Sequence, residues 1–168
     1  GPQKRFLLGL GIEHQKNTLF YDSFNNTLSY QKLEESRNSQ RSGDELISRT
    51  ENVFVIANST DFIKKWDYNM LNYGVDVQQN IVLSEATEGY TSRYADGGSE
   101  MTMLSVYSQY KLALSKGSYI SAGGRYSKAK LNADFDSANS LGLPYKSIRL
   151  TNDAITGSVG FKWNMNKG

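Results

Sequence analysis

The chain has 168 residues, enough for one domain, and its net charge of +2 is too small to indicate a nucleic acid partner. It contains no cysteine, which excludes a disulfide framework and a thiolate metal site, and no apolar run approaches the ~18 residues of a membrane-spanning helix. The 15 glycines and 11 tyrosines, against 2 prolines, favour long β-strands that bend at glycine.

The first three predicted strands cover residues 4–15, 25–37 and 46–61, and alternating side chains identify each of them. The first strand has one apolar face, made of Phe6, Leu8, Leu10 and Ile12. The second carries Leu28 and Tyr30 on its apolar face. In the third, residues 53–57 are apolar on both faces, so the pattern leaves the orientation of this strand open. Residues 63–66 are predicted to form a short turn.

Residues 67–86 show the clearest alternation. Every second residue is apolar except Gln79, in the set Leu71, Tyr73, Val75, Val77, Gln79, Ile81 and Leu83. The residues between them are polar or glycine except Val82, in the set Asn72, Gly74, Asp76, Gln78, Asn80, Val82 and Ser84. A period of two places these sets on opposite faces of a strand. The run is about three times as long as the ~5–6 residues usual for a strand in a soluble domain.

Three more strands are predicted at residues 100–115, 118–131 and 147–164. Long polar loops at residues 87–98 and 132–146 alternate with a tight turn at Lys116 and Gly117. The outward residues of these strands include Leu104, Val106 and Ile120. The inward ones include Lys111, Arg125 and Lys162.

Long strands with one apolar and one polar face predict an antiparallel transmembrane β-barrel, with lipid outside and water or protein inside. Connections alternate between short and long, as in outer-membrane barrels, although residues 16–24 make a longer connection than that rule expects. Because closed bacterial barrels have an even number of strands, these seven indicate either a missed strand or one section of a larger barrel. The alternatives are a self-contained barrel of about eight strands with an adhesin or structural role, and a soluble all-β binding domain.

Six motifs follow one another along nearly the whole chain. They are SYQKLEESRNSQR at 29–41, SRTENVFVIANSTDF at 48–62, NYGVDVQQN at 72–80, SRYADGGSEM at 92–101, GGRYS at 123–127 and TGSVGFKW at 156–163. In this order and spacing they resemble the barrel domain of TonB-dependent outer-membrane receptors, especially those of Bacteroidetes. The resemblance implies a barrel of about 22 strands, a plug domain inside it, a TonB box, and uptake of an iron chelate, haem, cobalamin or a glycan at the bacterial outer membrane.

By this resemblance, residues 1–168 are a section of the barrel domain, without the plug domain or the TonB box. The expected partners are outer-membrane lipid, the rest of the barrel and the plug, TonB indirectly through the plug, and a small solute. The residues expected to face the lumen or the plug are Glu13, Asp76, Gln78, Lys111, Arg125 and Lys162.

The loop at 87–98 carries the candidate ligand-binding residues Tyr90, Arg93, Tyr94 and Asp96, because a mixture of rings and charges is typical of recognition surfaces. His14 is the only histidine, no cysteine is available to help it, and no Gly-x-Ser-x-Gly motif occurs. We therefore expect no catalytic residue, metal site or cofactor, and no enzymatic activity.

Overall fold

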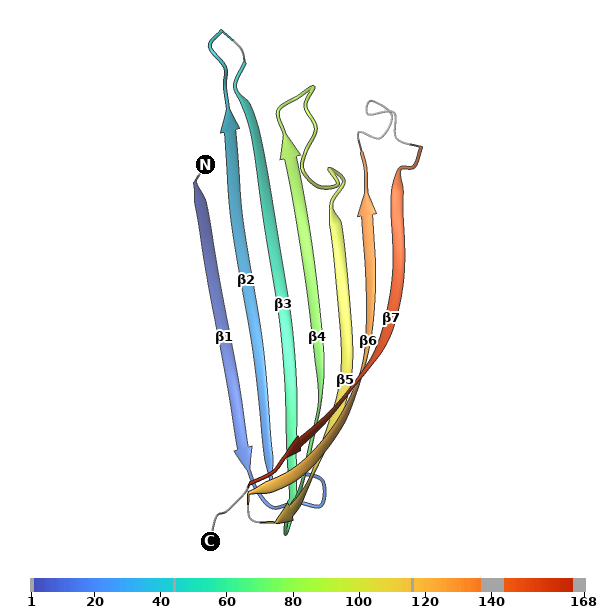
Figure 1. Cartoon of the computed structure of the whole chain (residues 1–168). Helices are drawn as coiled ribbons and strands as arrows, with labels where there is room; N and C mark the ends of the chain where they lie inside the picture. The colour runs from blue at the N-terminus through green and yellow to red at the C-terminus, as the bar shows by residue number, and fades with distance from the viewer. Residues whose placement is uncertain (1, 44, 116, 137–143, 165–168) are drawn as a thin grey trace.

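The described residues form a single antiparallel sheet of seven strands in sequence order (Figure 1). This computed structural model describes residues 2–43, 45–115, 117–136 and 144–164. The strands are β1 (Gln3–Gln15), β2 (Ser23–Ser39), β3 (Ile47–Trp66), β4 (Asn69–Ala86), β5 (Ser99–Ser115), β6 (Ser118–Asp134) and β7 (Ser147–Lys162). Each strand pairs with the next along the chain, which confirms the predicted all-β, antiparallel class.

The strand register assigns the side chains to two faces. Across β4 and β5, Val75 pairs with Val106, while the next pair, Asp76 and Ser105, points to the opposite side. We call the side of Val75 the outer face and the side of Asp76 the inner face. Because the pairing is regular, the alternation in the sequence becomes one mainly apolar face and one mainly polar face of the whole sheet.

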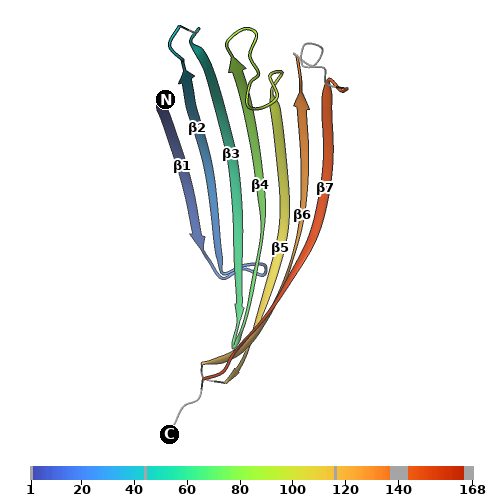
Figure 2. The same cartoon turned by 45° about the horizontal axis from the view of Figure 1, so that its top comes forward.

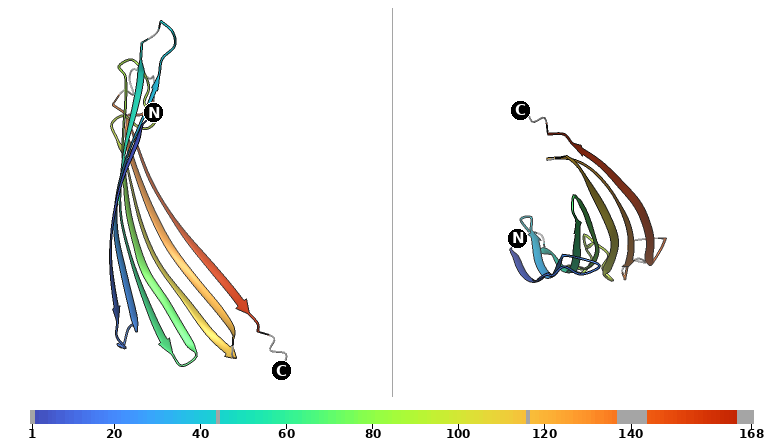
Figure 3. Two further views of the ribbon diagram at one scale, coloured as in Figure 1. Left: turned by 90° about the vertical axis from the view of Figure 1, so that its left-hand side faces the viewer. Right: turned by 90° about the horizontal axis from the view of Figure 1, so that it is seen from below.

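The sheet is curved and twisted (Figures 2 and 3). Seen from below, the strands follow an arc from β1 to β7 (Figure 3). A hollow on the inner face is lined by residues from Ser23 in β2 to Ser158 in β7, as a concave wall requires. The outermost strands of the described sheet, β1 and β7, do not pair with each other, so the arc is open.

The two ends of the sheet have different connections. At the lower end of Figure 1, Asp67 and Tyr68 alone join β3 to β4, and β5 ends at Ser115 shortly before β6 begins at Ser118. Lys116, expected in that tight turn, lies outside the described residues. At the other end, residues 40–46, 87–98 and 135–146 make longer connections. We refer to these as the short-turn end and the long-loop end.

The predicted turn at residues 63–66 is wrong, because β3 continues through this segment. Ile63 pairs with Asn72, and Trp66 pairs with Asn69. The chain reverses at Asp67, whose φ of 42° lies in the left-handed region that aspartate tolerates. The backbone hydrogen bonds to β4 determine this boundary, and the local alternation of side chains does not reveal it.

The orientation of β3, which the sequence leaves open, follows from its partner strand. Phe54 pairs with Ile81 on the outer face, and Val55 pairs with Asn80 on the inner face. The ambiguity arose because Val53, Val55 and Ala57 give β3 an apolar stretch on the inner face as well.

The sheet has no conventional hydrophobic core. Among the described residues, the buried apolar side chains are Ala95 and Ala133, while Val75, Val106 and Val159 on the outer face are exposed. A soluble protein rarely exposes an apolar surface of this extent, so the outer face requires an apolar environment. No helix among the described residues is long and apolar enough to cross a membrane.

Candidate functional site

The centre of the inner face carries a connected polar network. The guanidinium of Arg125 forms an ion pair with Asp76 at 2.9 Å, and the hydroxyl of Ser59 donates to Asp76 at 2.7 Å. Tyr107 donates a hydrogen bond to Asp61, and the guanidinium of Arg125 lies 5.7 Å from the Tyr107 ring centroid. The network joins β3, β4, β5 and β6, so it fixes charged groups at one place across four strands.

Gly74 makes room for this network. It lies on the inner face of β4, opposite Asp61 on β3 and Tyr107 on β5. A Cβ atom at Gly74 would come 2.5 Å from the Tyr107 hydroxyl and still closer to the carbonyl oxygen of Thr60. Tyr107 therefore crosses β4 over a glycine to reach Asp61.

A hollow of about 560 Å³ lies beside the network, toward the short-turn end. Asp61, Tyr107 and Arg125 form part of its wall, and Gly123 on the inner face of β6 contributes backbone where a side chain would fill the space. Because it lies on the concave face and combines polar and apolar groups in its wall, it is a surface that another segment or a solute can occupy.

The inner-face residues predicted from the sequence fall into separate groups. Asp76 and Arg125 form the ion pair of the network, and the side-chain amide of Gln78 donates to Asn80 at 2.9 Å. Lys111 and Lys162 lie near one ring, with their Nζ atoms 3.8 Å and 6.0 Å from the centroid of Tyr119. Glu13 lies on the same face of β1 but belongs to neither group.

Sequence reasoning missed Asp61 and Tyr119 as members of the inner face. Asp61 ends the strand whose orientation the pattern leaves open, so only its pairing with Gly74 assigns its face. Tyr119 follows the inward alternation of β6, and that alternation alone could have identified it.

The four candidate loop residues do not converge on one site. Arg93 points to the inner face, where its Nη1 atom lies 3.8 Å from Glu51 and 4.0 Å from Glu35. Tyr94 lies against Arg93, with the guanidinium 5.7 Å from its ring centroid. Asp96 accepts a hydrogen bond from the backbone of Asp136, and Tyr90 lines a different hollow beside the loop at residues 40–46.

Arg93 serves the fold of the long-loop end. Glu51 is only 3% exposed, and neither of its carboxylate oxygens has a hydrogen bond among the described residues. A buried carboxylate without a counter-charge is costly, so Arg93 both neutralises Glu51 and holds the loop at residues 87–98 against the inner face.

No group of three or more histidine, aspartate or glutamate side chains in the described ranges is arranged to hold a metal ion. The site is therefore defined by its polar concave wall, its ion pair and its hollow. Together with the apolar convex face and the short turns at one end, these features define a section of a membrane β-barrel wall.

Comparison with known proteins identifies the family. The family model described as TonB dependent receptor-like, beta-barrel, matches residues 1–168, so the chain belongs to this family. Among solved structures, the copper transporter OprC is similar, with a TM-score of 0.82 and 12% sequence identity. The alignment covers 98% of this chain and 28% of the OprC chain, so this chain spans about a quarter of the length of that protein. No curated protein sequence matches the chain.

Proposed function

We propose that residues 1–168 are a section of the barrel domain of an outer-membrane TonB-dependent receptor that takes up a scarce solute. The solute is an iron chelate, haem, cobalamin or a glycan. The similarity to OprC does not extend to its cargo, because 12% identity shows the fold alone. In the complete receptor, other strands extend the sheet from β1 and β7 until the barrel closes. Closure is required because unpaired backbone groups in lipid cost several kcal/mol each.

The observation that carries this proposal is the division between the two faces. The outer face exposes apolar side chains such as Val75 and Val106, while the inner face holds the Asp76–Arg125 ion pair beside the hollow. A lipid-facing exterior and a polar interior are what a solute-transporting barrel needs. Membership of the family supports the outer membrane as the location and TonB, acting through the plug, as the energy source.

In this proposal the inner-face residues contact the plug or line the lumen. Lys111 and Lys162 approach a tyrosine ring and have no carboxylate partner among the described residues. A plug segment with acidic side chains would complete their pairing, since buried cations require counter-charges. The half-exposed pair of Asp76 and Arg125 would become buried in the same way. At the long-loop end, Tyr90 lines a hollow beside the loop at residues 40–46. Of the four candidate loop residues, we assign solute contact to Tyr90.

Uptake by cells that express the complete receptor tests the proposal. Radiolabelled iron chelates, haem, cobalamin and glycans are supplied with and without an ionophore that collapses the proton gradient. We expect accumulation of one class, and we expect the ionophore to abolish it. Accumulation that is insensitive to the ionophore would show passive diffusion and contradict energy coupling.

Two neighbouring positions on β5 test the plug contact. Lys111→Cys places a thiol on the inner face, and Leu112→Cys places one on the outer face as the matched control. A water-soluble maleimide should label position 111 several-fold faster after deletion of the plug, with position 112 unchanged. Equal labelling of position 111 with and without the plug would contradict the contact.

A further inference from the structure

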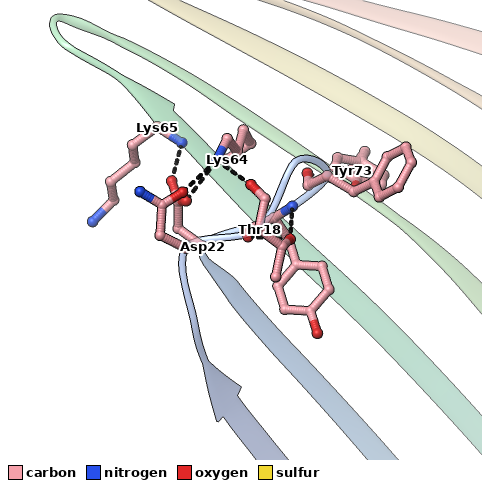
Figure 4. Close-up of polar contacts among 8 residues, drawn as sticks. Thr18, Asp22, Lys64, Lys65 and Tyr73 are labelled. Atoms are coloured by element: carbon pink, nitrogen blue, oxygen red, sulfur yellow. Dashed lines mark hydrogen bonds and ion pairs between the residues drawn. The ribbon is translucent and has the colours of Figure 1, made fainter.

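The connection at residues 16–22 does not extend away from the short-turn end but folds back onto the outer face of the sheet. The backbone N–H of Asp22 donates to the carbonyl of Ile63 at 2.7 Å, which ties the connection to β3. The hydroxyl of Tyr73, on the outer face of β4, donates to the carbonyl of Phe20 at 3.0 Å. Figure 4 shows the connection crossing β3 to reach Tyr73. Its unusual length therefore allows it to cover part of the barrel wall.

The side chain of Lys64, on the outer face of β3, holds this connection in place through three hydrogen bonds. Its Nζ atom donates to the side chain of Asn17 at 3.1 Å, to the carbonyl of Thr18 at 2.5 Å and to Asp22 at 2.7 Å (Figure 4). The backbone N–H of Lys65 donates to the other carboxylate oxygen of Asp22. Lys64 is only 7% exposed, so a charge on the outer face is paired and hidden.

A row of rings supports the same connection. Tyr21 lies 5.7 Å from Phe62, and Phe62 stacks on Tyr73 at 5.0 Å between centroids. Phe24 completes the row, 5.2 Å from Phe62. Rings with polar groups at one end favour the boundary between membrane and water. The underside of the connection is therefore packed on the outer face at the short-turn end.

The upper side of the connection is apolar and uncovered. Leu19 is 82% exposed and Phe20 is 71% exposed. The backbone of Thr18, just before them, has hydrogen-bond partners on both its N–H and its carbonyl. A loop that presents leucine and phenylalanine on its uncovered side does not suit water. These side chains continue the apolar outer face, which already requires an apolar environment.

We propose that residues 16–22 form a lipid-binding loop, in which Leu19 and Phe20 insert at the headgroup–acyl boundary of the periplasmic leaflet, since the short turns of outer-membrane barrels face the periplasm. This inference rests on the membrane location given under the proposed function. The exposed Lys16, at the start of the loop, lies where it can attract the phosphate of a phospholipid. Phospholipid is favoured over a protein partner because the loop is continuous with the outer face and exposes purely apolar side chains, Leu19 and Phe20, beside an aromatic row.

Spin-label accessibility in the complete receptor tests this inference. The chain has no cysteine, so Phe20→Cys gives one labelling position within it. The receptor is placed in nanodiscs of phosphatidylethanolamine and phosphatidylglycerol, and collisions of the label with oxygen and with a water-soluble nickel chelate are compared. We expect the ratio of oxygen to nickel collisions at position 20 to be several-fold higher than at Tyr90→Cys, in the loop at the other end.

Val106→Cys, on the outer face in the middle of β5, separates the two proposals. If position 106 is accessible to lipid and position 20 to the nickel chelate, the loop extends into water and only the loop inference is overturned. If position 20 is closed to both reagents, another protein covers it and the inference is again overturned. If position 106 itself is accessible to the nickel chelate, the membrane location is wrong.

Discussion

Gly74→Ala should destabilise the barrel wall, because the added methyl group has no space. The new Cβ atom would lie 2.5 Å from the Tyr107 hydroxyl and closer to the backbone carbonyl of Thr60. Tyr107 could move, but it would then lose its hydrogen bond to Asp61. The Thr60 carbonyl belongs to a paired strand, so it can move only if β3 shifts relative to β4.

The size of the effect follows from two opposing contributions. Overpacking a well-packed site costs about 1–3 kcal/mol. Replacing glycine by alanine, where the backbone permits it, gains about 0.4–1 kcal/mol by restricting the unfolded chain. Gly74 does not have a positive φ, so the gain applies there as well. The net result is a loss of stability on the order of 1–2 kcal/mol.

Gly124→Ala is the matched control. Its nearest atom to an added Cβ would be the carbonyl oxygen of Thr156 at 3.9 Å, an ordinary contact, so this variant should be neutral or slightly stabilised. The assay is the temperature at which the folded, faster-migrating form of the complete receptor converts to the unfolded form on electrophoresis. Equal conversion temperatures for the Gly74 and Gly124 variants would refute the packing argument.

Three further outcomes are expected. In a receptor from which the plug is deleted, Asp76→Asn removes one side of the ion pair with Arg125, and because both side chains are then partly exposed the loss should be at most about 1 kcal/mol and smaller in high salt; an effect independent of salt would contradict this assignment. Arg93→Ala leaves Glu51 buried without its counter-charge, so limited proteolysis should cleave the loop at residues 87–98 faster, whereas unchanged cleavage would show that another group holds the loop. The lysine hydrogen bond lowers the pKa of Asp22. The Asp22–Lys64 contact therefore stabilises the lipid-binding loop at neutral pH, and this stabilisation is lost only as the pH falls through the lowered pKa. A spin label at position 20 would report the loss as a rise in nickel-chelate accessibility. Release of the loop near neutral pH would contradict this prediction.

The sequence predicts the strands well because each face has its own surroundings. Alternation in residues 67–86 predicted that Val75 and Asp76 lie on opposite faces, and the register confirms that they do. This pattern works where side chains on the two faces differ in polarity. It failed for β3, because Val53 and Val55 give its inner face apolar residues that only pairing with β4 can orient.

Contacts between distant residues were beyond the reach of the sequence pattern. Alternation could place Asp76 and Arg125 on one face, but their 2.9 Å contact depends on the register of three successive strands. The lipid-binding loop was visible only as a connection longer than expected. Its attachment through Lys64 could not be predicted, because a lysine on the outer face interrupts the apolar pattern. Only the structure shows that Asp22 is among its hydrogen-bond acceptors.

If these seven strands are one section of the wall of a larger barrel, the polypeptide that contains them must be much heavier than this chain. The measurement is the intact mass of the heat-modifiable polypeptide, purified in detergent from the outer membrane of its source. We expect a polypeptide several times heavier than the 18.8 kDa of this chain. A heat-modifiable, β-rich polypeptide of 18.8 kDa would contradict it, because these residues would then close a barrel without other strands.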